Sequence, residues 1–450
     1  MKTLTAKQLY SVLWRWHFYA GIFAVPFVII LAATGAIYLF KPQIDAFSSA
    51  PYRGLSITGD LATADAQVEA ALAAVPGATF SAYELPLGST DAATILVNKN
   101  FQTMRVYVHP QSLHVLAIAD EQSPLLRYAR DIHRELLLGK FGSILVELAA
   151  CWAIVLVLTG VYLWWPRSAK GLAGVLYPRV TFKGRLFWRD LHSVIGIWIS
   201  FFVLFLLISG LPWAFVWGNA LNQVRELTHT TATKQDWVIA GQHHHETISQ
   251  TALPSTYVND TPKLPLDAII KNAEQLHLNH PVLIRPPIGK SGAPTQPWIK
   301  QSATNWTISS TTQNRTLNVD VELDAHTGKL LSKSDFSDKH IIDRAVGIGI
   351  SAHEGQLFGW LNQLLGLLTA IGLIVLSISG FTMWRKRAPA NVLGAPPKVH
   401  DAKLGLGFLI IIGTAAILLP ALGISLIVLS ILEFLVLSRF TKIKIWLGLA

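Results

Sequence analysis

The 450-residue chain has one cysteine, Cys151, and only 14% charged residues. A single cysteine excludes an intramolecular disulfide, a cysteine-rich zinc site, C-x-x-C redox chemistry and covalent haem attachment through C-x-x-C-H. No G-x-G-x-x-G stretch follows a predicted strand, so a flavin or nicotinamide domain is not expected. Low charge together with 51% hydrophobic residues is instead typical of a membrane protein.

Long apolar runs are present. Four of them, near 16–40, 144–165, 193–217 and 360–384, each approach the ~20 residues that a helix needs to cross a ~30 Å hydrocarbon core. A fifth run, 405–437, is too long for one untilted crossing and has Pro420 near its middle, where proline interrupts a helix. We predict a hairpin of two short helices there, which gives six spans.

Basic residues gather in the short segments 1–15, 166–190, 385–403 and 438–450. These hold 17 of the 37 Lys and Arg residues but only two acids, Asp190 and Asp401. The positive-inside rule places them, and both termini, in the cytoplasm, and the polar stretches 41–130 and 218–350 on the periplasmic face of a bacterial inner membrane. The net charge of +10 therefore indicates topology and contact with acidic lipids, not nucleic-acid binding.

The chain also repeats itself in two registers. His17 and His192 are each followed by glycine four and eighteen residues later, with a hydroxyl residue before the second glycine. His133 and His353 are each followed by glycine at +6 and +27 and by tryptophan at +31. The matching residues are Gly21 and Gly196, Thr34 and Ser209, Gly35 and Gly210, Gly139 and Gly359, Gly160 and Gly380, and Trp164 and Trp384. The unit is helix, outer domain, helix, used twice in the same orientation.

The predicted fold is mainly α, a six-helix transmembrane bundle built on this parallel repeat. A C-terminal helical hairpin completes it, and two small α+β periplasmic modules are inserted. In the modules we expect helices at 65–75 and 266–276 and strands at 104–108 and 319–324. The segments are span one (1–40), module one (41–130), span two (131–166), a cytoplasmic loop (167–190), span three (191–217), module two (218–350), span four (351–385), a second loop (386–404), the hairpin (405–437) and a tail (438–450).

Histidine at membrane depth is costly and is a functional candidate, although a lone one is as often hydrogen-bonded between helices. Here the repeat brings equivalent residues face to face. His17 and His192 lie just inside the cytoplasmic boundary, and His133 and His353 at the outer one. Two facing imidazoles are the axial ligands of six-coordinate haem iron, whereas zinc needs three or four protein ligands. We predict two b-type haems, one near each face, which together pass electrons across the membrane.

Two arginines stand three residues before candidate ligands. Arg130 precedes His133 and Arg189 precedes His192. They are candidates for contacts with the haem propionates, or else interfacial anchors. The electron donor is expected to be a cytoplasmic reductase or membrane quinol, because the cytoplasmic loops are too short to hold a reductase domain.

At these residues the chain resembles the PepSY-associated transmembrane proteins, whose members include inner-membrane ferric-siderophore reductases. The features that carry the resemblance run over nearly the whole chain: 15–21 (RWHFYAG), 189–196 (RDLHSVIG), 130–133 (RDIH) and 352–355 (AHEG) before 360–362 (WLN). The outer modules are similar to PepSY domains, with 324–329 (DAHTGK) like the usual ending. Module one departs from that ending at 110–114 (PQSLH), which lacks the glycine. The resemblance implies haem-dependent reduction of a ferric siderophore, with release of iron in the periplasm.

Other features allow other interpretations. The tract His243-His244-His245, with His229 and Glu246 nearby, could capture a metal or substrate, or be a solvated loop. Trp213 and Trp217 could lie beside the outer haem or belong to an interfacial aromatic belt. Glu433 has no evident partner, and could face the bundle interior or lie near the cytoplasmic boundary. Two alternative functions are a transporter for a metal or siderophore, since parallel repeats also build permeases, and a non-enzymatic PepSY sensor or regulator.

Overall fold

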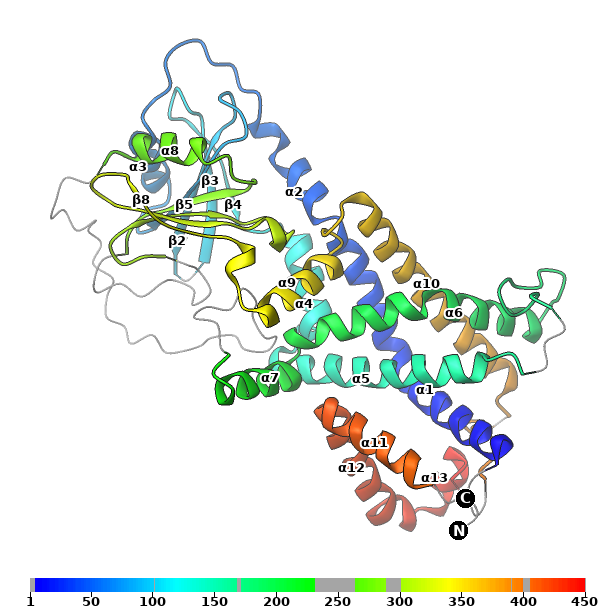
Figure 1. Cartoon of the computed structure of the whole chain (residues 1–450). Helices are drawn as coiled ribbons and strands as arrows, with labels where there is room; N and C mark the ends of the chain where they lie inside the picture. The colour runs from blue at the N-terminus through cyan, green and yellow to red at the C-terminus, as the bar shows by residue number, and fades with distance from the viewer. Residues whose placement is uncertain are drawn as a thin grey trace.

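The computed structural model describes residues 5–100, 102–167, 171–230, 264–288, 301–389, 391–399 and 405–449. These residues form a bundle of long helices and a β-sheet module at one end of it (Figure 1). Both chain termini lie close together at the end of the bundle that is farther from the sheet.

Four helices form the bundle and are long and apolar enough to cross a membrane. They are α1 (Ala6–Leu39), α5 (Gly139–Trp164), α6 (Arg185–Gly210) and α10 (Trp360–Arg387). Helix α1 packs against α5 and α10, and α6 packs against the same two helices. The four therefore close a ring in which α1 stands diagonally opposite α6.

The C-terminal run forms two short helices, α11 (Leu406–Leu418) and α12 (Pro420–Leu435), as predicted. They meet at a bend of 120°. At ~1.5 Å per residue each is only about 20 to 24 Å long, which is less than a ~30 Å hydrocarbon core. Length and composition thus support four spans, or five with the bent pair as one broken span, among the described residues.

Short helices connect the bundle to the sheet. These are α2 (Lys41–Ser49), α4 (Pro124–Glu135), α7 (Phe215–Leu227) and α9 (Ile341–His353). Helix α4 stops before α5 because Leu136, Leu137 and Gly139 adopt positive φ. Helix α9 stops before α10 in the same way, at Gly355 and Gly359. The second and fourth predicted spans therefore each begin with a separate helix.

The sheet differs from the prediction of two small modules. Its eight strands form one antiparallel sheet in the order β4-β3-β2-β1-β5-β6-β7-β8. The modules join where β1 pairs with β5, at Tyr83 with Ile284 and Glu84 with Leu283. The strands are β1 (Thr79–Glu84), β2 (Ala93–Lys99), β3 (Gln102–Val108), β4 (Val115–Asp120), β5 (Val282–Arg285), β6 (Trp306–Ser310), β7 (Asp320–Leu323) and β8 (Leu330–Ser334).

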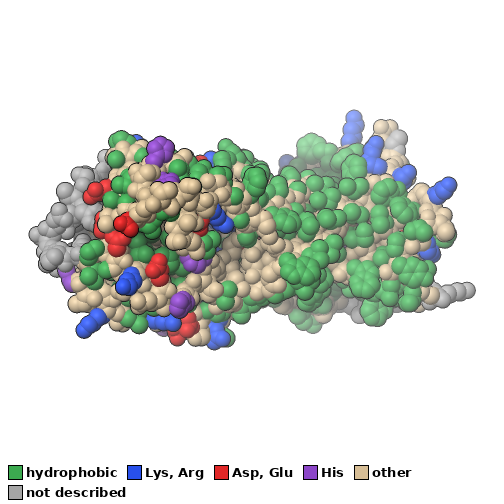
Figure 2. Space-filling view, turned by 90° about the horizontal axis from the view of Figure 1, so that it is seen from above, with side chains coloured by type: hydrophobic (Ala, Val, Ile, Leu, Met, Phe, Trp, Pro, Cys, Tyr) green, Lys and Arg blue, Asp and Glu red, His purple; other side chains and the backbone are tan. Residues whose placement is uncertain are grey.

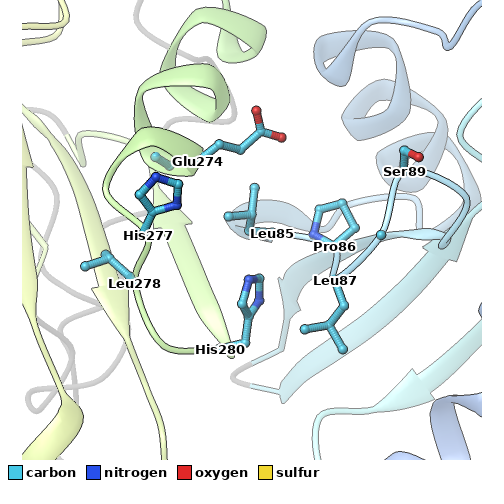
Figure 3. A pocket seen from close by; sticks show the side chains of 10 residues that line it. Leu85, Pro86, Leu87, Ser89, Glu274, His277, Leu278 and His280 are labelled. Carbon is cyan, nitrogen blue, oxygen red and sulfur yellow. The ribbon is translucent and has the colours of Figure 1, made fainter.

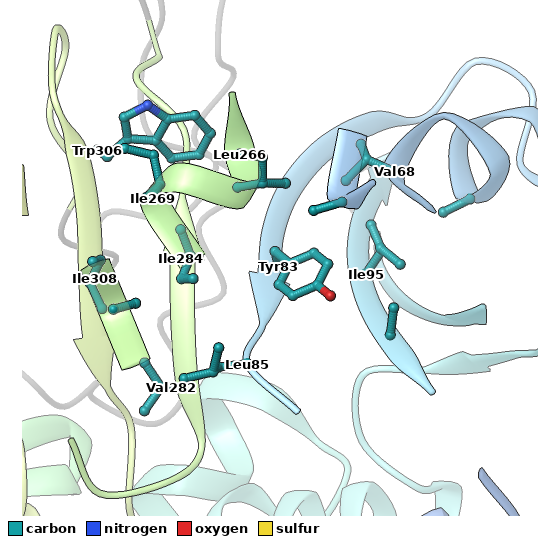
Figure 4. Close-up of a cluster of buried hydrophobic side chains, with 14 of the residues drawn as sticks. Val68, Tyr83, Leu85, Ile95, Leu266, Ile269, Val282, Ile284, Trp306 and Ile308 are labelled. Carbon is teal, nitrogen blue, oxygen red and sulfur yellow. The ribbon is translucent and has the colours of Figure 1, made fainter. Parts of the chain in front are cut away.

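Helices α3 (Ala64–Ala74) and α8 (Leu266–Gln275) pack on one face of this sheet, within a residue of their predicted bounds. Val68, Tyr83 and Ile95 from the first module share one buried core with Ile269 and Ile284 from the second (Figure 4). The two helix N-termini also cap each other. Asp267 accepts the Ala64 N–H at 3.0 Å, and Asp65 accepts the Leu266 N–H at 3.2 Å. This exchange is what a twofold relation between the modules requires.

The molecular surface separates by side-chain type. Hydrophobic side chains cover the helical part in Figure 2, and acidic ones gather at the sheet end. Lys and Arg side chains mark the opposite end. An apolar belt between a mixed polar domain and a basic rim is the surface of a multi-pass membrane protein.

Candidate functional site

The structure brings the four bundle histidines together in two pairs. The rings of His17 on α1 and His192 on α6 have centroids 6.3 Å apart and planes at 90°. The rings of His133 on α4 and His353 on α9 have centroids 6.4 Å apart and planes at 81°. We call these the inner pair and the outer pair. The outer pair lies on the two helices that connect the bundle to the sheet.

A hydroxyl side chain on a neighbouring helix contacts Nδ1 of every ring. Thr159 lies 2.9 Å from His17 and Ser379 lies 3.1 Å from His192. The outer pair is held in the same way, by Thr34 at 3.2 Å from His133 and by Ser209 at 2.9 Å from His353. His133 and His192 also contact backbone carbonyls, those of Leu31 and Leu376.

These contacts fix the protonation of the rings. Each hydroxyl donates its own proton to a carbonyl of its helix, so it accepts from the histidine. A proton on Nδ1 satisfies all of these contacts, and that tautomer leaves the Nε2 lone pair available for a metal. A histidine whose other nitrogen donates to a fixed oxygen is the usual arrangement of a metal ligand.

A glycine follows each of the four hydroxyl residues and makes room for the ring. A Cβ on Gly35 would stand 3.0 Å from His133 Cε1, and one on Gly160 would stand 3.2 Å from His17 Cε1. The distance is 3.4 Å for Gly210 facing His353 and for Gly380 facing His192. The repeated hydroxyl-glycine dipeptide is thus a cradle for one imidazole.

The ring spacing fits a metal between the two members of a pair. An imidazole nitrogen lies about 1.1 Å from its ring centroid and an imidazole–metal bond is about 2.0 Å, so two imidazoles that bound one ion from opposite sides would have centroids about 6.2 Å apart. The observed spacings are 6.3 and 6.4 Å. Each site offers two imidazoles only, and no group of three or more His, Cys, Asp or Glu suited to a metal occurs among the described residues. Two protein ligands suit a metal whose other ligands come from a macrocycle.

Each half of the chain contributes equally to both pairs. In the first half α5 holds His17 and α1 holds His133, whereas in the second half α10 holds His192 and α6 holds His353. Thr34 stands seventeen residues after His17, so the two pairs are separated by about 25 Å along α1 at 1.5 Å per residue. This places one pair toward each end of the bundle.

The two arginines proposed for propionates have protein partners. Arg130 pairs with Asp131 at 2.9 Å and donates to Gln122 at 2.7 Å. Arg189 pairs with Asp190 at 2.9 Å, and its side chain is 54% exposed. Their role toward a cofactor stays a prediction.

The two tryptophans at the outer end of α6 have different surroundings. The Trp213 indole stands against His353, with ring centroids 5.4 Å apart at 90°. Trp217 turns to the C-terminal pair instead and donates to the Leu418 carbonyl at 3.0 Å. Of these two tryptophans, Trp213 therefore lies at the outer pair, and a place beside a haem stays a prediction.

The tryptophans at the other end of the repeat tie down the loops that follow the helices. Trp164 donates to the Val175 carbonyl at 3.0 Å and Trp384 to the Leu393 carbonyl at 2.8 Å. This explains a repeated landmark that had no assigned role.

Two buried polar groups near the outer pair were not singled out in the sequence. Glu147 on α5 is 1% exposed and accepts the N–H groups of Val216 and Trp217, at 2.7 and 3.0 Å. Arg225 on α7 forms a two-point ion pair with Asp343 on α9, both contacts at 2.9 Å. Since Asp343 and His353 share α9, this ion pair anchors the helix that carries His353.

The Glu354 carboxyl follows His353 directly. Burial raises its pKa, and the cations Arg315 and Lys41 act in the opposite direction. A carboxyl thus lies next to the outer pair in the sequence, whereas the holders Thr34 and Ser209 lie within apolar helices.

Two sequence candidates remain, the histidine tract and Glu433. His243, His244, His245 and Glu246 fall outside the described residues, and Glu433 is exposed on α12. A cavity of about 440 Å³ lies where the two modules meet, between the β1–β2 loop and the end of α8 (Figure 3). Glu274, His277 and His280 line it beside Leu85 and Leu87.

Comparison with known proteins agrees with the sequence resemblance. A family model described as the PepSY-associated TM region matches residues 14–387, which include all four histidines. No curated protein matches the chain.

Proposed function

Since the chain belongs to the PepSY-associated TM region family, we propose that it is a di-haem electron-transfer protein of the bacterial inner membrane that reduces a ferric siderophore on the periplasmic side. The observation that carries the proposal is the spacing of 6.3 and 6.4 Å between the rings of the two pairs. The Nδ1 contacts that leave Nε2 available to a metal support it further.

When bound, b-type haems supply reversible one-electron chemistry, which is the chemistry needed to reduce Fe(III) in a chelate. His17 and His192 would hold the inner haem, and His133 and His353 the outer one. The hydroxyl-glycine cradles hold each imidazole in one tautomer, so little reorganisation accompanies a change of charge at the metal. The apolar helices exclude water between the two pairs.

The topology that we propose has both termini in the cytoplasm. Four crossing helices return the chain to its starting side, and the α11–α12 pair would then enter the membrane and leave on that side, in place of two full spans. The basic rim at the end that holds both termini supports this orientation. The inner pair would accept electrons from a cytoplasmic reductase or membrane quinol, and the outer pair would deliver them at the sheet end.

The test is a reduced-minus-oxidised visible spectrum of protein purified from cells with adequate haem, with pyridine haemochrome quantification. We expect two b-type haems per chain with six-coordinate spectra, reoxidised by a ferric siderophore. A colourless protein would refute the proposal and direct attention to the transporter or sensor. If the protein held haem that ferric chelates did not reoxidise, the proposed electron transfer would stand and the ferric siderophore would be rejected as its acceptor.

A further inference from the structure

One position of the repeat carries an aromatic residue in both halves and has no role so far. Tyr38 and Trp213 each stand 21 residues after an inner-pair histidine and four after the hydroxyl residue that holds an outer one. Residues four apart share a face of a helix. The repeat therefore places an aromatic ring one turn beyond each outer cradle.

In the second half this ring completes a three-sided seat for His353. Ser209 contacts Nδ1 at 2.9 Å, and a Cβ on Gly210 would lie 3.4 Å from Cε1. Trp213 meets the same imidazole edge-on at 5.4 Å. Contact on three sides fixes both the position of the ring and the rotation of its plane.

A buried carboxyl caps the helix that begins just after Trp213. The chain leaves the α-helix at 211–213, in a 3-10 turn, and starts α7 at Phe215. Glu147 caps that start by accepting the N–H groups of Val216 and Trp217. An acid in a membrane-spanning helix is expensive, and the favourable meeting of a carboxylate with a helix N-terminus offsets that cost.

The first half uses its aromatic residue differently. α1 continues as a helix to Leu39, so Tyr38 lies in its last turn. The outer pair thus has an indole against His353, whereas the ring in contact with His133 among the described residues is that of His353 itself. For the inner pair, the only ring contacts recorded among the described residues are between its own two imidazoles.

We propose that Trp213 is a positioning residue that sets the plane of His353, that Glu147 holds Trp213 in place, and that the outer site therefore differs electronically from the inner one. This inference rests on the proposed function, because the electronic difference is expressed in a bound haem. Ligand orientation and the surroundings of a ligand are among the means by which a protein tunes a haem.

The experiment uses the full-length, haem-loaded protein and compares W213L and W213F with the matched control W217F, whose indole contacts α11 instead of a histidine. The readouts are haem content, the low-temperature EPR spectrum of the oxidised protein and the two midpoint potentials. We expect W213L to keep two haems but to shift the low-spin signal and the potential of one of them. W213F, which keeps a ring, should shift the same signal less, and W217F should leave both unchanged.

Glu147 is tested in the same way. E147A loses both N–H contacts and should shift the same signal as W213L, whereas E147Q keeps one acceptor oxygen and should shift it less. Wild-type protein without haem would refute the proposed function, and this inference with it. Two haems in the wild type and an unchanged spectrum in W213L, or equal shifts of both haems, would refute this inference alone.

Discussion

In the first half of the chain, a Cβ on the cradle glycines would stand 3.0 or 3.2 Å from the histidine it faces, and in the second half 3.4 Å. The hydroxyl contacts, by contrast, fall between 2.9 and 3.2 Å in both halves. The hydroxyl contacts of the cradles are thus nearly identical, and the glycines pack slightly tighter in the first half. Only the second half, among the described residues, adds a tryptophan, Trp213, against a histidine ring. Away from the rings the halves diverge more.

The turn that precedes the last strand of each module shows this divergence. In module two, the Asp324 carboxylate accepts the N–H groups of His326 and Thr327, and Gly328 has φ of +66°. In module one His109 Nδ1 accepts the N–H groups of Gln111 and Ser112, and Leu113 has φ of +62°. One turn is therefore built from different residues. The comparison teaches that both halves keep the hydroxyl-glycine contacts to the histidine rings. The two turns keep the same backbone shape but use different residues.

The largest effect is expected from the histidines themselves. His17→Ala and His192→Ala should each remove the same haem, and His133→Ala and His353→Ala the other one, because each pair takes one ligand from each half. Pyridine haemochrome and EPR should show a fall from two haems to one. His280→Ala, an exposed histidine of the outer module, should keep both. Loss of different haems by the two members of one pair would contradict the pairing.

A second effect, on stability, is expected in the second half of the chain alone. Asp343 stands ten residues before His353, and Ser123 holds the same place before His133, so the buried ion pair with Arg225 belongs to the second half alone. Asp343→Ala should cost about 3–5 kcal/mol because it leaves an uncompensated buried charge. Thermal unfolding in detergent measures this loss of stability. The outer haem should dissociate before the inner one as the protein is heated.

The matched control is the double variant Arg225→Met with Asp343→Leu. Removing both charges and keeping the volume should recover most of the stability. If the double variant were as unstable as the single one, lost packing and not charge would be the cause.

A third effect compares the cradles. Gly35→Ala should force His133 aside, and overpacking of this kind costs about 1–3 kcal/mol. Gly210→Ala should cost less, because its Cβ would stand 3.4 Å from His353 instead of 3.0 Å. The dissociation rate of the outer haem, compared between the two variants, checks the order. Equal rates would show that the small difference in packing has no consequence.

A fourth, smaller effect concerns the turns. Gly328→Leu copies the first module, but a left-handed conformation costs a non-glycine residue about 1–2 kcal/mol. In addition, the new Cβ would stand 2.8 Å from Asn272 Nδ2 and 2.9 Å from Leu264 Cδ1. Leu113 avoids that clash because it packs against the module core. Thermal unfolding should show a loss for Gly328→Leu, and no loss would mean that the turn relaxes freely.

The smallest effect is a pH dependence. Hydrogen bonds from the Thr327 backbone and hydroxyl and the His326 N–H hold the pKa of Asp324 below its usual value. A depressed folded pKa gives stability that is present above the unfolded value of ~3.9 and is lost as pH falls through the folded one. Asp324→Asn should therefore flatten the acid slope of unfolding below about pH 4. If the slope were unchanged, the acid dependence of stability would come from other carboxylates.

Much of this architecture follows from spacing alone. The positions of His17, His133, His192 and His353 in two registers predict which rings meet, and the structure brings those rings together. Thr34 and Ser209 were visible as residues before a glycine. Thr159 and Ser379 occupy the same place before Gly160 and Gly380, so the same signal could have found all four holders.

Other features could not be read from the sequence. The pairing of β1 with β5 joins strands about 200 residues apart, and each module alone has the pattern of a small complete domain. The Arg225–Asp343 pair joins residues 118 apart, and nothing local distinguishes these residues from solvated charges. Glu147 gave a local signal, an acid in an apolar run, but its role depends on where α7 begins.

The division of the ligands between the halves bears on the origin of the chain. Because each half supplies one ligand and one cradle to each pair, two identical copies of a half-length ancestor, related by a twofold axis, would already assemble both sites. Fusion of a duplicated gene would preserve both sites, and the two halves would then no longer have to be identical in sequence. Tyr38 and Trp213 stand at the same position of the repeat, and two identical subunits could not have held two different residues there.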